Sequence, residues 1–340
     1  MNMMNSLICL EPRNMVYQSR PQPTPAAGEA VIKIIAAGIC GTDIHAWAGN
    51  QPFFSYPRVL GHELCGEIVA LGSEVRSLHA GQRTVLIPYV SCLQCAACRS
   101  GKSNCCENIS VIGVHQDGGF CEYLSVPASN LLVVDDLAPE AAALIEPFAI
   151  SAHAVRRAAL QPDEHLLVVG AGPIGLGVAA IARAAGASVI VADTSEFRRQ
   201  HVVAALGLPV LNPADSNFLP ALRQHCSGML AAKVIDASGN PQAMNSTVSL
   251  IRHGGTIVFV GLFKGDLQFS DAEFHKKETT MMGSRNATAE DFATVRQLMA
   301  SGKIAADMML NQHFAFARLA DEFEAQVINN RQLIKGVIHF

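Results

Sequence analysis

A glycine-rich stretch between two apolar runs limits the possible folds of this chain more than any other feature. Residues 166–169 are apolar, the sequence Gly-Ala-Gly-Pro-Ile-Gly occupies 170–175, and an Ala-rich segment leads to a second apolar run at 188–192. This order of strand, glycine turn, helix and strand is typical of a parallel βαβ unit that binds a dinucleotide. The glycines allow the pyrophosphate to approach the helix N-terminus closely.

An acid completes the pattern, since Asp193 directly follows the second run, 23 residues after Gly170. A carboxylate at this position can bind the adenine ribose hydroxyls and repels a 2′-phosphate, so we expect NAD to be favoured over NADP. The nearby Arg198 and Arg199 slightly weaken the expected preference for NAD, because an arginine near the ribose can accommodate a 2′-phosphate. The residues predicted to bind NAD are Gly170, Gly172, Pro173, Ile174, Gly175, Asp193 and Arg198.

Further alternating strand and helix patterns follow, with short apolar runs at 210–211, 233–237 and 256–260. They predict an α/β chain with a doubly wound parallel sheet. The chain of 340 residues, half of them apolar, is long enough for two cores, although a one-domain barrel is an alternative. We therefore expect a β-rich metal-binding domain at 1–148, a nucleotide-binding domain at 149–284, and a tail at 285–340 that returns to the first domain.

Charge and hydropathy exclude several partners. The formal net charge is −4 and the basic residues are scattered, which argues against binding to nucleic acid. No uninterrupted apolar run reaches the roughly 18 residues of a membrane-spanning helix, and the first residues lack the pattern of a signal peptide. We therefore expect a cytoplasmic protein without a membrane partner.

Ten cysteines in a long chain of this kind, four of them clustered, indicate metal binding rather than disulfides. The cluster has the spacing C-x2-C-x2-C-x7-C in a segment rich in polar residues and glycine. Four thiolates around zinc form a closed structural site, and Cys105, next to the last of them, is a possible competitor. The predicted ligands are Cys92, Cys95, Cys98 and Cys106.

A second metal site is indicated by Cys40 and by the sequence Gly-His-Glu at 61–63, because zinc with one open position prefers mixed ligands. Adjacent residues on a strand point to opposite faces, so His62 and Glu63 require a bend if both are to reach one ion. Glu146 lies in an apolar context, where a carboxylate needs a metal or a cation. Thr42 and His45 share one face of a predicted helical turn and can pass a proton to solvent, or they are merely a cap and a surface histidine.

Together these motifs resemble the zinc-containing medium-chain dehydrogenases over the whole chain. Glu146, in Ile-Glu-Pro-Phe, resembles the sorbitol and threonine dehydrogenase branch. The resemblance implies a GroES-like β-rich domain, a Rossmann domain, and one catalytic and one structural Zn²⁺. It also implies a catalytic zinc held by Cys40, His62 and either Glu63 or Glu146, with Asp43 as a partner of His62. In this family the substrate proton leaves through Thr42 and the cofactor ribose to His45, and we expect a homo-oligomer, either a dimer or a tetramer.

A narrower resemblance to oxidoreductases of sugar acids is carried by the segments 45–57, 113–120, 261–265, 275–278 and 283–286. It implies oxidation of a secondary hydroxyl of a sugar acid. Such a substrate requires a cation, and His115 and Arg285 are the predicted contacts, with Lys276 as a further candidate. The alternatives are an L-threonine or neutral polyol dehydrogenase of the same branch, and a nucleotide-binding protein without catalytic activity.

Overall fold

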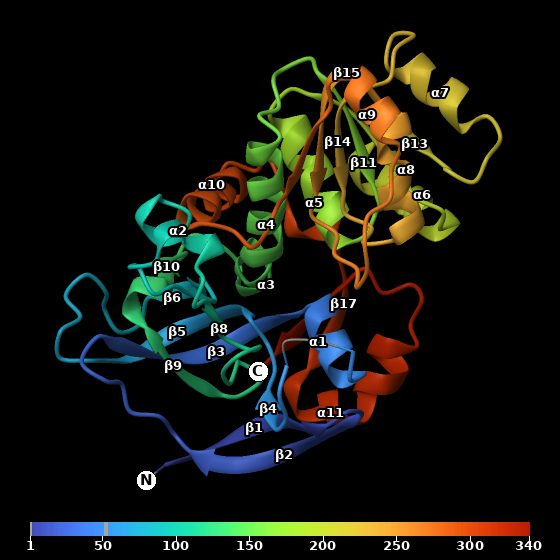
Figure 1. Ribbon diagram of the computed structural model, residues 1–340. Helices are drawn as coiled ribbons and strands as arrows, with labels where there is room; N and C mark the ends of the chain where they lie inside the picture. Colours follow the sequence, from blue (N-terminus) through green and yellow to red (C-terminus); the bar gives the residue numbers. More distant parts are fainter. Residues whose placement is uncertain (1, 51–53) are drawn as a thin grey trace. The chain divides into compact units, whose positions relative to one another are not determined.

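The computed structural model describes residues 2–50 and 54–340 and divides the chain into two compact units (Figure 1). Unit 1 comprises Met1–Glu146, Thr288–Gly302 and Leu310–Phe340, and unit 2 comprises Pro147–Ala287 and Lys303–Met309. We expected residues 285–340 to return to the first domain, but residues 285–287 and Lys303–Met309 belong to unit 2. A long-range hydrogen bond accounts for part of this difference, because His201 Nε2 lies 2.8 Å from the Met308 carbonyl within unit 2. Residues 51–53, in one of the segments that carried the narrower resemblance, lie outside the described residues.

Unit 1 is built on mainly antiparallel β-sheet, in which only β17 and β18 among the described strands pair in parallel. One sheet has the order β2-β1-β4, and a second has the order β10-β6-β5-β3-β18-β17 with β9 also paired to β3. A small two-stranded sheet pairs β7 with β8. The strands are β1 (Met3–Glu11), β2 (Asn14–Pro21), β3 (Glu29–Ile39), β4 (Arg58–Val59), β5 (Glu63–Leu71), β6 (Arg83–Leu86), β7 (Tyr89–Val90), β8 (Ser110–Val111), β9 (Tyr123–Pro127), β10 (Leu131–Val133), β17 (Leu310–Ala315) and β18 (Lys335–His339).

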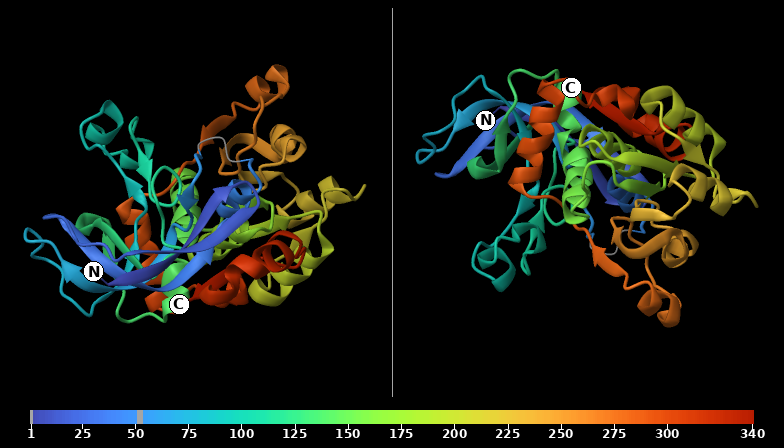
Figure 2. Two further views of the ribbon diagram at one scale, coloured as in Figure 1. Left: turned by 90° about the horizontal axis from the view of Figure 1, so that it is seen from below. Right: turned by 90° about the horizontal axis from the view of Figure 1, so that it is seen from above.

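The last strand of the chain, β18, is an inner strand of this second sheet. β18 lies between β3 and β17 and pairs antiparallel with β3, with Gly336 opposite Ile39. Both chain ends consequently belong to unit 1 (Figure 2). Apolar side chains such as Ile32, Leu64 and Ile338 are fully buried in its core, which ties the C-terminal strand to the strands that lead to the predicted metal ligands.

Most of the described helices of unit 1 are short, and α10 (Ala289–Ala300) is the exception with 12 residues. α1 (Gly41–Trp47) starts at the end of β3, where Cys40 and Asp43 form a capping box that satisfies backbone groups of the first turn. The remaining helical segments that the structure describes in this unit are α2 (Ala96–Arg99), α3 (Pro139–Ala143) and α11 (Leu319–Glu322), the 3₁₀ segments η1 (Ser103–Cys105), η2 (Ala128–Asn130) and η4 (Phe316–Arg318), and the π-helical turn η5 (Phe323–Ile328).

Unit 2 is a six-stranded parallel sheet with the order β13-β12-β11-β14-β15-β16. The strand order reverses between β11 and β14, so the crossover through α5 (to β12) and the crossover through α8 (to β15) run in opposite directions along the sheet. The predicted doubly wound sheet is thus confirmed. The elements are β11 (His165–Val169), β12 (Ser188–Ala192), β13 (Val210–Leu211), β14 (Ala231–Asp236), β15 (Ile251–Phe259), β16 (Thr280–Gly283), α5 (Pro173–Ala184), α6 (Glu196–Leu206), α7 (Phe218–His225), α8 (Pro241–Leu250) and α9 (Asp271–Lys276), and α4 (Ile145–Arg157) leads into this unit from Glu146.

Among the described residues, none of the helices combines the length and the apolar character needed to cross a bilayer.

Candidate functional site

Three predicted metal ligands converge in unit 1. Cys40 stands at the N-cap of α1, His62 precedes β5, and Glu63 is the first residue of β5. One donor atom from each lies within 4.8 Å of the donors of the other two. The bend that this requires is present, because Gly61 has φ +92° and a side chain there would collide with the Phe120 ring.

Asp43 joins the two turns that carry these ligands. Its side chain is fully buried, Oδ2 accepts a hydrogen bond from the Cys40 backbone N–H at 2.8 Å, and Oδ1 accepts one from Gly61 N–H at 3.2 Å. Oδ1 also lies 3.8 Å from His62 Nδ1, which is an ion-pair distance rather than a hydrogen bond. Burial raises the pKa of Asp43 above its usual value. Asp43 thus positions Cys40 through its own backbone N–H and His62 through the backbone N–H of the preceding residue, Gly61.

The second predicted carboxylate, Glu146, lies in the same electrostatic environment as these donors. Burial raises the pKa of Glu146 to about 7, with His62 opposing and Glu63 reinforcing the shift. Burial also disfavours charge on His62, but Cys40, Asp43 and Glu146 outweigh it and raise the pKa of His62 well above the usual value. The group within 4.8 Å contains Glu63 and does not include Glu146.

Two residues that the sequence did not single out hold these carboxylates. The Lys335 ammonium donates to Glu63 Oε1 at 2.5 Å, and the Tyr89 hydroxyl donates to Glu146 Oε1. The sequence does contain an indication for Lys335, because this lysine interrupts an apolar run, and a lysine in a buried segment needs an acidic or polar partner. Tyr89 carries no comparable signal.

These donors fit a divalent cation. Glu63 Oε2, Glu146 Oε2 and His62 Nδ1 are buried without a hydrogen-bond partner. Buried acidic groups are costly when unpaired, and the acids here outnumber the Lys335 ammonium. Thiolate, imidazole and carboxylate together form a donor set that zinc prefers.

The predicted proton-transfer pair lies beside this cluster. Thr42 and His45 both belong to α1, three residues apart, and therefore lie on neighbouring positions of one helical face. Thr42 is half-buried and His45 is exposed. The two side chains therefore extend from the partly buried position of Thr42 to the solvent-exposed position of His45.

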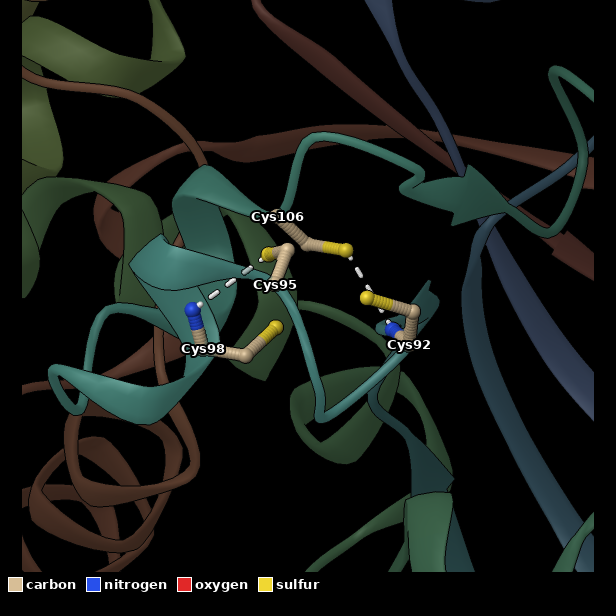
Figure 3. A group of neighbouring side chains, drawn as sticks. All are labelled: Cys92, Cys95, Cys98 and Cys106. Carbon is tan, nitrogen blue, oxygen red and sulfur yellow. Dashed lines mark hydrogen bonds between the residues drawn. The ribbon is translucent and has the colours of Figure 1, made fainter.

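The four predicted structural ligands also come together. The sulfur atoms of Cys92, Cys95, Cys98 and Cys106 lie within 4.8 Å of one another and face a common space (Figure 3). Cys98 N–H donates to Cys95 Sγ at 3.5 Å, and Cys92 N–H donates to Cys106 Sγ at 3.2 Å. Cys105 is exposed and outside this group.

The thiol pKa values in this cluster fit metal binding. Backbone N–H groups of Gln94 and Cys95 lower the pKa of Cys92 to about 6, and those of Cys98 and Glu107 lower the pKa of Cys95. Burial and the neighbouring sulfur atoms raise the pKa of Cys98 to about 12. A metal ion allows all four to ionise together, and the set suits a closed tetrahedral zinc site.

In unit 2 the glycine turn lies at the point where the strand order reverses. Gly170 has φ +98°, and a side chain there would meet Ser238, which follows β14. A Cβ at Gly175 would lie 1.8 Å from the Gly170 carbonyl oxygen, so this glycine permits α5 to start close to the turn. Gly172 is the N-cap of α5, and Pro173 and Ile174 open the helix. Such a helix N-terminus suits a pyrophosphate.

Asp193 follows β12 and is largely buried, with 8% exposed. Its Oδ2 accepts from Ala171 N–H and its Oδ1 from Ser195 N–H, both at 2.7 Å. Arg198 Nη1 lies 3.9 Å from Oδ2. Asp193 therefore connects the glycine turn to the start of α6 through hydrogen bonds, and each of its carboxylate oxygens retains a lone pair for a further hydrogen bond.

The two predicted substrate contacts lie in different units. His115 is exposed in unit 1, where its Nδ1 accepts from Val111 N–H at 2.9 Å. In the same loop Asp117 pairs with Arg20 at 2.9 Å and accepts from Val59 N–H, so this acid braces the turn before His62. Arg285 is exposed in unit 2 and follows the carboxyl end of β16. Both remain predicted substrate contacts.

Comparisons with known proteins agree with this arrangement. Residues 26–136 match the alcohol dehydrogenase GroES-like domain, and residues 173–301 match the zinc-binding dehydrogenase family. The chain is 67% identical over 340 residues to L-galactonate-5-dehydrogenase of Escherichia coli (strain K12), with all of both chains covered. It is 31% identical over 310 residues to L-threonine 3-dehydrogenase of Pyrococcus abyssi, covering 89% of each chain.

A solved structure extends the similarity to the fold. The alcohol dehydrogenase rspB from E. coli CFT073, complexed with NADH, superimposes with a TM-score of 0.93 at 31% identity over 99% of both chains. The predicted combination of a GroES-like domain and a Rossmann domain is confirmed. With its two family domains in order and a relative this similar over its whole length, the chain belongs to the zinc-type medium-chain alcohol dehydrogenase family.

Proposed function

We propose that this enzyme oxidises a secondary hydroxyl of a sugar acid with NAD, converting L-galactonate to D-tagaturonate. The observation that carries the proposal is the 67% identity, over the full length, to a protein named L-galactonate-5-dehydrogenase. The donor cluster around Cys40 and the acid at Asp193 support it independently, because they suit zinc and NAD respectively.

Cys40, His62 and a carboxylate of Glu63 or Glu146 would hold the catalytic zinc, and the four clustered cysteines would hold the structural zinc. When bound, the catalytic ion supplies a Lewis acid that lowers the pKa of the substrate hydroxyl, and NAD supplies the hydride acceptor. Asp43 keeps the two ligand turns in place through Cys40 N–H and Gly61 N–H. The backbone N–H groups at the start of α5 would bind the pyrophosphate, and Asp193 would bind the adenine ribose.

The substrate proton must leave the buried cluster. The Thr42 hydroxyl would accept it while giving up its own hydroxyl proton, and His45, on the exposed side of α1, would take up the relayed proton and release it to solvent. The carboxylate of the sugar acid requires a cation, and Arg285 is the preferred candidate because its guanidinium can donate two parallel hydrogen bonds. His115 is the alternative contact.

The test is a substrate panel in which the appearance of reduced nicotinamide is followed with L-galactonate, L-threonine and sorbitol. A charged hydrogen bond contributes about 1.5–3 kcal/mol, so L-galactonate should exceed the polyol at least about tenfold in kcat/KM. The product should be identified as D-tagaturonate by NMR. A preference for L-threonine would instead support the second candidate, a threonine dehydrogenase, which the P. abyssi relative favours.

Two further features belong to the proposal. We place the enzyme in the cytoplasm, because all ten cysteines are unpaired and two thiolate metal sites suit a reducing compartment. We also propose a homo-oligomer, either a dimer or a tetramer, since unit 2 exposes Leu262, Leu267 and Phe269 and ends its sheet with the unpaired edge of β16. Light scattering during size-exclusion chromatography should give a mass of two or four chains.

A further inference from the structure

A buried ion pair lies against the candidate zinc ligands and has no place in the proton-transfer scheme. Lys335 and Glu63 have side chains that are 2% and 0% exposed, and Nζ lies 2.5 Å from Oε1. The same ammonium donates to the Ile39 carbonyl at 3.0 Å, one residue before Cys40. Lys335 thus connects the last strand of the chain to the segments that carry Cys40 and His62.

The two oxygens of Glu63 have different surroundings. Oε1 is held by the ammonium, whereas Oε2 is buried without a partner. Oε2 lies directly over Gly38, where a Cβ would be only 1.9 Å away. The absence of a side chain at Gly38 therefore makes room for an oxygen that is left available for another ligand.

The carboxylate of Glu146 is held by a different kind of group. Its Oε1 is held by the neutral hydroxyl of Tyr89, and its Oε2 is likewise buried without a partner. Each rival carboxylate therefore has one oxygen engaged and one available. They differ in the group that contacts Oε1, which is a full positive charge at Glu63 and a neutral hydroxyl dipole at Glu146, although the Lys335 charge also acts on Glu146 through space.

We propose that Lys335 is a positioning residue that limits Glu63 to a single-oxygen donor toward the catalytic metal and so keeps a coordination position open for substrate. The proposal rests on the assignment of zinc to this cluster. Lysine suits the role because it is a compact point charge that engages one oxygen, whereas the planar guanidinium of arginine engages both oxygens of a carboxylate. The identity of the cation at position 335 then decides how much of Glu63 reaches the metal.

Two substitutions at this position should have opposite effects. In Lys335→Met, only the metal offsets the charge of Glu63, so both carboxylate oxygens become available to it. The metal should then bind at least as tightly as in the parent protein, but the second oxygen should occupy the coordination position that is otherwise open for substrate. In Lys335→Arg, the guanidinium should withdraw both oxygens of Glu63, and metal affinity should fall by about tenfold or more, as for partners of metal ligands generally. A purely structural role would weaken metal binding in both variants alike.

The measurements are zinc dissociation constants by chelator competition and the visible absorption of the cobalt-substituted protein. The four-cysteine site contributes equally to each variant, so difference spectra against the parent protein report the catalytic site. Lys335→Met should weaken the cobalt bands, as higher coordination does, and Lys335→Arg should intensify them. Lys277→Met is the matched control, because Lys277 is also buried but donates to the Val248 and Ile251 carbonyls in unit 2. It should change stability without changing the cobalt spectrum.

Glu63→Gln completes the design. It should weaken zinc binding about tenfold or more in the parent protein and have little further effect in the Lys335→Arg background. If Lys335→Arg does not fold, Glu63→Gln in the Lys335→Met background must weaken zinc binding. Cobalt spectra that are unchanged by both substitutions at Lys335 would overturn this inference. A parent protein that binds no metal outside the four-cysteine site would instead refute the proposed function.

Discussion

Replacing Asp193 with Asn should reduce both the stability of unit 2 and its preference for NAD. The carboxylate accepts backbone hydrogen bonds from Ala171 and Ser195, each at 2.7 Å. An amide can accept only one of them, because its nitrogen is a donor. An unsatisfied buried N–H costs about 1–3 kcal/mol. At about 2–4 °C per kcal/mol for a domain of this size, the melting temperature should fall by roughly 2–12 °C.

The cofactor effect follows from the lost charge. Under the proposed function, Asp193 also accepts from the ribose hydroxyls, and one charge-assisted hydrogen bond contributes about 1.5–3 kcal/mol. Because 1.4 kcal/mol corresponds to a factor of ten, kcat/KM for NAD should fall about 10- to 150-fold. The ratio of kcat/KM for NAD to that for NADP should also fall, since a 2′-phosphate no longer meets a carboxylate.

Glu196→Gln is the matched control for this experiment. It removes the same charge three residues away, at an exposed position in the first turn of α6. Exposed substitutions of this kind usually change stability by less than about 0.5 kcal/mol, so melting temperature and cofactor preference should stay near those of the parent. An Asp193→Asn enzyme that retains the parent's ratio of NAD to NADP would refute the assignment of this acid to the ribose.

Three further predictions concern the metal sites and the substrate. Cys40→Ala should lose the catalytic ion and turnover while retaining its circular dichroism spectrum, and near-normal activity after zinc depletion would contradict the ligand assignment. Cys95→Ser should lose the other ion and melt at lower temperature or aggregate, because the lobe depends on metal-coupled folding; unchanged zinc content and melting would rule this out. Arg285→Lys should reduce kcat/KM for L-galactonate far more than for an uncharged polyol, because lysine cannot reproduce a bidentate contact. Equal losses for both substrates would make Arg285 a structural residue and leave His115 as the substrate contact.

Local motifs were readable from the sequence because their residues are close together in the chain. The glycine turn and Asp193 belong to one βαβ unit, and the four cysteines span 15 residues from 92 to 106. The spacing along the chain and the local backbone geometry are sufficient to bring these residues together, so the motifs can be recognised without knowledge of the rest of the fold. The metal site formed by Cys40 and Gly-His-Glu at 61–63 could also be predicted, because thiolate, imidazole and carboxylate together are ligands that zinc prefers.

The tertiary structure decided which distant side chains complete these motifs. Lys335 reaches Glu63 across 272 positions, and Tyr89 reaches Glu146 across 57. Neither contact follows from local periodicity, because it depends on β18 pairing with β3 and on how β7 lies beside the start of α4. The same holds for the segment 303–309, which groups with unit 2 although the chain on both sides of it belongs to unit 1. The sequence by itself therefore determined the family, the two metal sites as hypotheses and the nucleotide motif, whereas long-range packing alone decided how each buried carboxylate is held.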